Sequence, residues 1–199
     1  MSTETQRVVL ATSNPGKVRE FQILLAPMGL EIISQSDLGV SSPEETGLTF
    51  IENALIKARH AARMTGLPAI ADDSGLVVPA LNGMPGLYSA RYAGLNASDG
   101  ENVVRLLNDM AMLSDHDRIG YYLCAMTLIT QPTDPAPVIA QAGWPGRIGF
   151  EPKGTGGFGY DPIFIPEGSD RTAAEMDPDV KNAQSHRALA TAALIQQLS

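Results

Sequence analysis

The fold is decided by the stretch from Leu67 to Leu76, which reads LPAIADDSGL. Its apolar half is short and bounded by Pro68, which predicts a buried strand rather than a helix. We expect this strand to stop at two adjacent carboxylates, a hydroxyl and a glycine. Ligands in open α/β sheets lie beyond the carboxyl ends of the strands. Asp72 and Asp73 are therefore candidate site residues, and a metal ion or a proton would relieve the repulsion between them.

The letters DDSG also suit a plain turn, because Asp, Ser and Gly all favour turn conformations. This alternative places no ligand at the two carboxylates. Only the remainder of the chain separates the two interpretations.

Length and composition describe an ordinary globular protein. The chain has 199 residues, of which 44% are hydrophobic and 18% charged, and we expect one two-lobed domain over residues 1–199. Its net charge of −8 disfavours a nucleic-acid partner. A single cysteine, Cys124, excludes an internal disulfide. No run reaches membrane-spanning length and residues 1–7 are polar, so a cytoplasmic location is expected.

A candidate phosphate loop lies near the N-terminus. The short apolar strand expected at residues 7–12 runs into Ser13-Asn14-Pro15-Gly16-Lys17, after which apolar residues recur at helical spacing. A loop between a strand and a helix N-terminus points backbone N–H groups at an anion, and Lys17 adds a mobile charge. The segment lacks the glycine spacing of a Walker A loop, and Asn-Pro-Gly is also a common turn.

The middle of the chain adds a carboxylate and a change of sheet type. Glu45 precedes a predicted amphipathic helix over residues 50–65, where it could be a helix-end acid or an oxygen ligand for Mg²⁺. Residues 119–130 and 138–142 are predicted strands joined by a Pro-rich reversal, and Trp144-Pro145-Gly146-Arg147 is expected to end or bend the second. A hairpin following βαβ units predicts a mixed sheet.

The last third supplies a glycine-rich loop and two basic positions. The loop runs GGFGYDP from Gly156 to Pro162, where an aromatic side chain beside open backbone suits a nucleobase, although such rings are often core plugs. Lys181 follows a predicted helix start. His186 and Arg187 lie in the first turn of a final helix, where the helix dipole disfavours cations. Their position suggests an anionic or acceptor-rich ligand, and chance placement on the surface is the alternative.

These features together supply phosphate donors, metal ligands, a stacking ring and base-edge donors. The residues therefore predict a Mg²⁺-dependent enzyme that acts on a nucleotide.

Four motifs, in this order along the chain, also resemble those of the non-standard purine nucleoside triphosphate pyrophosphatases, the inosine triphosphatase family. They are TSNPGK (12–17), DDSGL (72–76), GGFGYDP (156–162) and SHR (185–187). The resemblance covers essentially the whole chain. It implies hydrolysis of ITP, dITP and XTP to the monophosphate and pyrophosphate, with Mg²⁺ and as a homodimer. It also implies two α/β lobes on a long mixed β-sheet, with the active site in the cleft between them.

The resemblance further implies a role for each matching residue. Asp73 would be the general base and a metal ligand together with Glu45, although its neighbour Glu44 remains an alternative ligand. Lys17 would be a catalytic residue beside Asp73 and would also bind the phosphates, together with Thr12, Ser13, Asn14, Pro15 and Gly16. Ser74 would line the site. The nucleoside would be held by Phe158, Gly159, Tyr160, Asp161, Lys181, His186 and Arg187.

Two alternatives stay open from the sequence. One is a Maf-type or other nucleotide pyrophosphatase with a different base specificity. The other is a non-catalytic nucleotide-binding module, although two carboxylates beside a phosphate loop would repel a triphosphate in the absence of metal. For the homodimer, the apolar residues of the Gly/Pro-rich loop 82–94 are the candidate contact surface.

Overall fold

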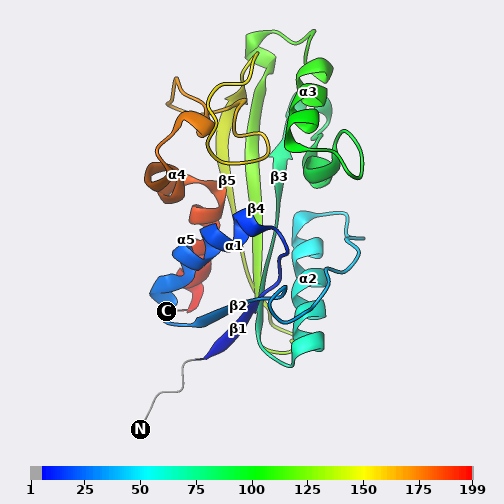
Figure 1. Cartoon of the computed structure of the whole chain (residues 1–199), viewed down its shortest axis with the longest axis vertical. Helices are drawn as coiled ribbons and strands as arrows, with labels where there is room; N and C mark the ends of the chain where they lie inside the picture. The colour runs from blue at the N-terminus through cyan, green and yellow to red at the C-terminus, as the bar shows by residue number, and fades with distance from the viewer. Residues whose placement is uncertain (1–5, 199) are drawn as a thin grey trace. The chain divides into compact units, whose positions relative to one another are not determined.

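The computed structural model describes residues 6–198 and belongs to the expected α/β class (Figure 1). The helices and strands, in chain order, are β1 (Arg7–Leu10), α1 (Pro15–Leu25), β2 (Glu31–Ser34), α2 (Phe50–Thr65), β3 (Ala69–Val77), α3 (Asp99–Asp109), β4 (Ile119–Ile129), β5 (Val138–Ile148), β6 (Phe164–Pro166), α4 (Pro178–Gln184) and α5 (His186–Leu198).

Six strands form one sheet in the order β2-β1-β3-β4-β5-β6. Strand β1 pairs in parallel with both β2 and β3, whereas β5 and β6 are antiparallel. The sheet is therefore mixed, as the sequence predicts.

The chain divides into two compact units, which are described separately. Among the described residues, unit 1 comprises 6–73, 124–142 and 187–198, and unit 2 comprises 74–123 and 143–186. Two of the boundaries fall inside the sequence motifs, between Asp73 and Ser74 and between His186 and Arg187.

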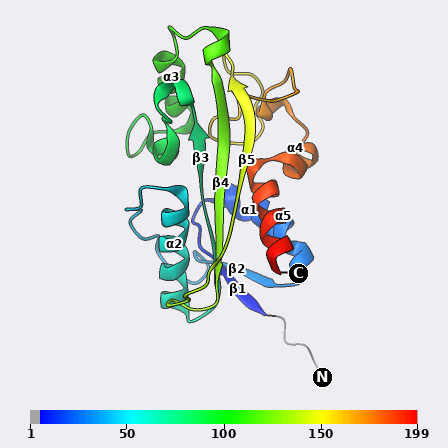
Figure 2. The ribbon, with the colours of Figure 1, turned by 180° about the vertical axis from the view of Figure 1, so that it is seen from behind.

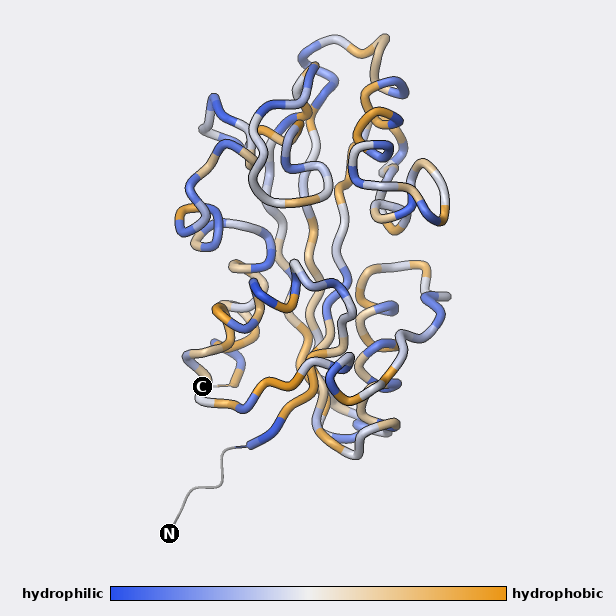
Figure 3. Tube along the Cα trace, viewed as in Figure 1, coloured by the Kyte–Doolittle hydropathy of each residue, from blue (hydrophilic) through white to orange (hydrophobic). Residues whose placement is uncertain are grey.

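In unit 1 the sheet carries helices on both faces, with α2 on one side and α1 and α5 on the other (Figures 1 and 2). Alternating strand residues separate two apolar clusters. Val8, Leu10 and Ile70 pack in the cluster that contains Phe21 of α1 and Leu194 of α5. The opposite cluster contains Val9, Ala11, Ala69 and Ala71, together with Ala58, Ala61 and Ala62 of α2. Figure 3 shows the chain turning from hydrophilic to hydrophobic as β1 begins.

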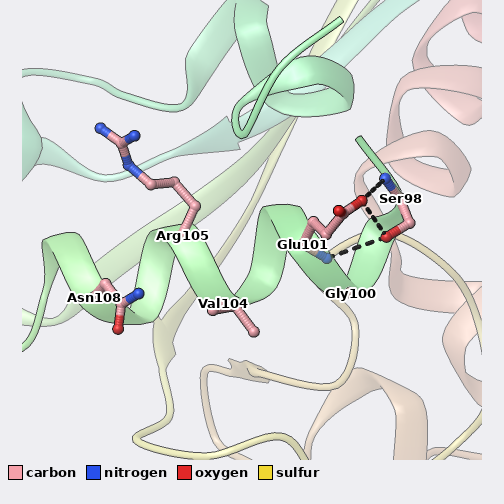
Figure 4. Close-up of a pocket in the computed structure, with 6 residues that line it drawn as sticks. All are labelled: Ser98, Gly100, Glu101, Val104, Arg105 and Asn108. Carbon is pink, nitrogen blue, oxygen red and sulfur yellow. Dashed lines mark hydrogen bonds between the residues drawn. The ribbon is translucent and has the colours of Figure 1, made fainter. Parts of the chain in front are cut away.

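Unit 2 has one apolar core, between α3 and the adjoining parts of the strands. Its members include residues of β3 to β6 and of α3: Leu76, Val103, Leu106, Tyr122, Trp144, Ile148 and Phe164. Helix α3 begins with a capping box. The Ser98 hydroxyl accepts from the Glu101 N–H, and Glu101 accepts from the Ser98 N–H (Figure 4).

The expectation that a strand stops at Asp72 is wrong, and so is the turn alternative. Strand β3 continues without interruption from Ala69 to Val77. Turn preferences are weak and local, whereas Leu76 beyond the carboxylates is fully buried in the core of unit 2. The two carboxylates therefore lie inside a strand and point to opposite faces of the sheet.

A second correction concerns Trp144-Pro145-Gly146-Arg147, which was expected to end or bend its strand. Strand β5 includes all four residues and runs from Val138 to Ile148. Trp144 and Ile148 are buried, whereas Pro145 is exposed and its carbonyl accepts from the Glu167 N–H. Proline is tolerated where its missing N–H is not required by a neighbouring strand.

The Gly/Pro-rich loop 82–94 is more ordered than a plain loop. It contains a 3-10 helix over Gly86–Arg91, and the Ser89 hydroxyl accepts from the Leu76 N–H of β3. Tyr92 packs against the core of unit 2 and donates to Asp109, so Tyr88 is the main exposed aromatic ring of the segment. Among residues 6–198, no helix is long and apolar enough to cross a membrane.

Candidate active site

Asp72 and Asp73 each meet a different lysine, because strand geometry turns them to opposite faces of the sheet. Asp72 shares its face with Ile70 and accepts from Lys17 Nζ of α1 at 2.7 Å. Asp73 shares its face with Ala71 and accepts from Lys57 Nζ of α2 at 2.9 Å. The repulsion expected between adjacent carboxylates is thus relieved by two ion pairs.

Lys57 connects Asp73 to the other predicted metal ligand. Its Nζ lies 2.8 Å from Glu45 Oε1 as well as 2.9 Å from Asp73 Oδ1. Glu44, the alternative ligand, is exposed. The structure therefore places Glu45, and not its neighbour, in the same cluster as Asp73.

Asn53 completes this cluster from the same side of α2. Its Nδ2 donates to Asp73 Oδ2 at 3.2 Å, and its Oδ1 accepts from the Gly47 N–H at 2.8 Å. Residues four apart lie on one helix face, so Asn53 and Lys57 reach Asp73 together. The amide ties the loop that carries Glu45 to the strand that carries Asp73.

Sequence reasoning missed both Asn53 and Lys57. Their signal was present, since they fall in the apolar stripe formed by Phe50, Ala54, Ala58 and Ala61. A lysine and an asparagine on the core side of an amphipathic helix require buried partners.

The pKa values of the two aspartates are shifted in opposite directions. Burial raises the pKa of Asp73 above its ordinary value, and this effect exceeds the lowering by Lys57. Burial also opposes ionisation of Asp72, but the charges of Lys17, Lys57 and Arg187 outweigh it and lower the pKa of Asp72. For Lys57, the nearby carboxylates outweigh desolvation and raise its pKa, so the ammonium stays protonated. Asp73 is thus the better proton acceptor of the pair.

The predicted phosphate loop lies between β1 and α1, but the N–H groups at the start of the helix are occupied. Asn14 caps α1, and its Oδ1 accepts from the N–H groups of Gly16 and Lys17 at 2.8 and 3.2 Å. The Asn14 N–H donates to Thr12 Oγ1, and Thr12 itself is buried. Pro15 has no N–H. Side chains, rather than an open row of amides, are therefore the main donors that this loop offers.

In unit 2, the glycine-rich loop folds around a buried ion pair. Asp161 Oδ2 accepts from Lys181 Nζ at 2.8 Å and from the Phe158 N–H at 2.9 Å. Gly157 has φ +72°, and a Cβ there would overlap the Asp161 carboxylate, so only glycine fits. Lys181 Nζ also lies 5.4 Å from the centre of the Phe158 ring. The pair fixes both the loop and its aromatic side chain.

Two further residues of this loop have internal partners. The Tyr160 ring is buried in the core of unit 2, and its hydroxyl donates to the Ser89 carbonyl at 2.8 Å. The Gly159 N–H donates to Asp99 Oδ2 at 2.7 Å. These two hydrogen bonds hold the glycine-rich loop against Ser89 and Asp99.

His186 and Arg187 are buried in different units. In unit 2, the His186 ring stacks on Tyr122, with centroids 4.7 Å apart and planes 7° apart. In unit 1, Arg187 Nη1 lies 2.9 Å from Glu20 Oε2 of α1, so this acid neutralises the arginine that the helix dipole disfavours. Ser74, the first residue of unit 2, is half-buried on β3.

Unit 2 also has a surface pocket on α3. Ser98, Gly100, Glu101, Val104, Arg105 and Asn108 line it, and none of them is a predicted site residue (Figure 4).

The donor set of unit 1 fits a divalent cation that also binds the substrate. Among residues 6–198, no group of three or more His, Cys, Asp or Glu side chains could hold a metal ion unaided. Mg²⁺ is commonly bound by one or two carboxylates plus substrate phosphates. Glu45 and Asp73, which converge on one ammonium group, supply such a pair.

Comparison with known proteins identifies the family. The model of the Ham1 family matches residues 8–197. A dITP/XTP pyrophosphatase of Shigella flexneri is 54% identical over 193 residues, covering 97% of this chain and 98% of that protein. A dITP/XTP pyrophosphatase of Escherichia coli K12 is 53% identical over the same length and coverage. The solved structure of a HAM1 protein from Coxiella burnetii is 48% identical with a TM-score of 0.91, covering 98% of each chain. The chain belongs to the Ham1 family.

Proposed function

We propose that this chain hydrolyses non-standard purine nucleoside triphosphates (ITP, dITP and XTP) to the monophosphate and pyrophosphate, and so removes them from the nucleotide pool. The observation that carries the proposal is the cluster of Asp73, Glu45 and Lys57. It occurs in a chain that matches dITP/XTP pyrophosphatases along almost its whole length.

Asp73 is the proposed general base. Release of pyrophosphate requires water to attack the α-phosphorus while the β,γ unit leaves. Asp73 accepts the proton of that water, a role suited to a carboxylate whose pKa is raised by burial. General base catalysis of this kind contributes typically about 10²- to 10⁴-fold.

Lys57 and Asn53 hold Asp73 in place for this step. Each occupies a different carboxylate oxygen, so the orientation of the group is fixed. The ammonium of Lys57 also offsets part of the negative charge that a polyphosphate brings to these acids.

The proposed metal is Mg²⁺, held by Glu45 and Asp73 together with substrate oxygens. When bound, it would neutralise charge on the phosphates as the leaving group departs. Lys57 contacts both ligands, so metal binding would redistribute the contacts of this lysine.

The substrate is divided between two groups of residues. The side chains of the loop from Thr12 to Lys17 bind the phosphates, and Lys17 provides a mobile charge. The loop residues Phe158 to Asp161, with Lys181, His186 and Arg187, bind the nucleoside, and Ser74 lines the site. Within this second group, the contacts of Asp161 with Lys181 and Phe158 support a positioning role.

The test is a product assay with Mg²⁺ on ITP, dITP and XTP, with ATP and GTP as controls. We expect pyrophosphate and monophosphate from the first three substrates at far higher kcat/KM than from the controls. Preference for a different base would indicate another pyrophosphatase specificity. Tight binding without pyrophosphate release would indicate a non-catalytic nucleotide-binding module.

We also propose a homodimer that acts in the cytoplasm, where the nucleotide pool lies. Exposed Tyr88, in the segment 82–94, is a candidate contact. Light scattering at micromolar concentration should give twice the chain mass, and a monomer mass would contradict this part of the proposal.

A further inference from the structure

A buried glutamine lies directly beneath the phosphate loop of unit 1. Gln35 follows β2 and is only 1% exposed. Its Nε2 donates to Ser13 Oγ and to Ser42 Oγ, both at 2.9 Å, and the two hydroxyl oxygens are 3.0 Å apart. Ser13 belongs to the predicted phosphate loop, whereas Ser42 lies three residues before Glu45.

The backbone of Gln35 is fixed at two points. Its N–H donates to the Leu10 carbonyl at the end of β1, and its carbonyl accepts from the Val40 N–H, both at 3.0 Å. These backbone hydrogen bonds fix the position from which the side-chain amide holds the two serines, which are themselves exposed.

The hydrogen bonds among Gln35, Ser13 and Ser42 limit the directions in which the two serine hydroxyl groups can donate. A glutamine amide nitrogen only donates, so both serine oxygens act as acceptors toward Gln35 Nε2. One serine hydroxyl hydrogen is used in the contact between the two oxygens. The second hydroxyl hydrogen is left to donate away from Gln35. Because phosphate oxygens are acceptors, a serine pair in this state is ready to bind one.

Stability alone does not account for the glutamine. Gln35 Oε1 is buried and has no hydrogen-bond partner among residues 6–198. An unsatisfied buried carbonyl destabilises a fold, whereas an apolar side chain of similar shape leaves the stability nearly unchanged or increases it. The unpaired oxygen is compatible with a residue retained for its N–H groups.

We propose that Gln35 is a positioning residue that holds Ser13 and Ser42 as a paired hydroxyl donor for the polyphosphate of the substrate. This inference rests on the proposed function and adds Ser42 to the phosphate-binding side chains. Gln35 itself does not touch the substrate.

The test compares Gln35→Met with wild type by ITP kinetics and by calorimetric binding of a non-hydrolysable ITP analogue in Mg²⁺. Methionine keeps the length of the side chain but lacks the two N–H donors. We expect KM and the dissociation constant to rise about tenfold, as for loss of one hydrogen bond to a charged group, with kcat changed less than about twofold. The melting temperature should stay the same or rise.

Two other variants separate positioning from general packing. Ser42→Ala should reproduce the loss of affinity, and the double variant with Gln35→Met should be little worse than either alone. Thr127→Val is the matched control, because Thr127 Oγ1 is also buried without a partner among the residues that the structure describes. It removes an unpaired atom at a position that the proposed site does not use, so it should leave KM unchanged.

The outcomes are distinguishable from failure of the proposed function. If wild type binds the analogue but releases no pyrophosphate, the proposed function fails while the binding constants still decide the role of Gln35. Unchanged affinity in Gln35→Met overturns the inference, as does a large fall in melting temperature with an equal loss of affinity in Thr127→Val. If wild type does not bind the analogue, both proposals fall.

Discussion

The ammonium nitrogen of Lys57 lies 2.9 Å from Asp73 Oδ1, in a region where both side chains are almost completely buried. This pairing determines how the proposed base titrates. Burial raises the pKa of Asp73, and the charge of Lys57 limits that rise. The lysine thus keeps a buried carboxylate ionised over a wider pH range.

Replacing Lys57 with methionine should therefore move the acidic limb of the pH–rate profile to higher pH. Without the lowering effect of Lys57, Asp73 is protonated at pH values where wild type remains active. The free energy of unfolding at pH 7 should fall by up to about 3–5 kcal/mol, because buried Asp73 and half-buried Glu45 lose their common partner. The measurement is kcat/KM against pH, and Lys57→Arg, which keeps the charge, is the control. An unmoved acidic limb in Lys57→Met would show that Asp73 is not the titrating base.

Asp73→Asn should preserve the fold and nucleotide binding but lose turnover by at least about 10²-fold, since it removes the base and a metal-side charge. Asp72→Asn is the matched control on the neighbouring residue. Steady-state kinetics with ITP compares the turnover of the two variants. A greater loss of turnover in Asp72→Asn would mean that the base has been assigned to the wrong carboxylate.

The two variants should also differ in stability. The pKa of Asp72 is lowered in the folded state, so this residue stabilises the fold above its unfolded pKa, and the contribution is lost as pH falls through the folded pKa. The pKa of Asp73 is raised, so its contribution to stability falls as pH rises from the ordinary aspartate range to the folded pKa. At pH 7, denaturant unfolding should therefore show a larger loss for Asp72→Asn than for Asp73→Asn, in which Lys57 stays paired with Glu45. Equal losses in the free energy of unfolding would contradict the opposite pKa shifts of Asp72 and Asp73.

Arg187→Ala should reduce activity on ITP much more than residual activity on ATP. Hypoxanthine presents a 6-oxygen that accepts from a fixed donor, whereas adenine presents an amino group that faces such a donor unfavourably. Loss of the arginine also removes its ion pair with Glu20, in which Nη1 and Oε2 are 2.9 Å apart. The ratio of kcat/KM values is the measurement. Phe158→Ala should instead lower both activities together, because stacking does not discriminate base edges. A constant ratio in Arg187→Ala would exclude Arg187 as the base reader.

Local chemistry predicted much of the fold. The apolar strand expected at residues 7–12 and the amphipathic helix expected over residues 50–65 correspond to β1 and α2, because each pattern depends on residues close together in sequence. The expected strand end at Asp72 was wrong because a local turn preference competed with burial of Leu76 in a distant part of the chain. Such burial depends on tertiary packing.

The site was predicted less completely than the fold. The motif residues were recognisable, but their partners lie far away in sequence: Lys17 is paired with Asp72 and Arg187 with Glu20. Asn53 and Lys57 were omissions with a readable signal, since both occupy core positions of an amphipathic helix. The buried hydrogen bonds of Gln35 had no such signal, because a polar residue in a polar connection is ordinarily exposed.

The most direct test of the central claim is the fate of oxygen during hydrolysis of ITP in ¹⁸O-enriched water with Mg²⁺. Water attack at the α-phosphorus places the label in the monophosphate and leaves the released pyrophosphate unlabelled. Mass spectrometry of the two products therefore identifies the phosphorus atom that is attacked. The account predicts labelled IMP and unlabelled pyrophosphate. Label in pyrophosphate, or release of orthophosphate as the first product, would contradict it.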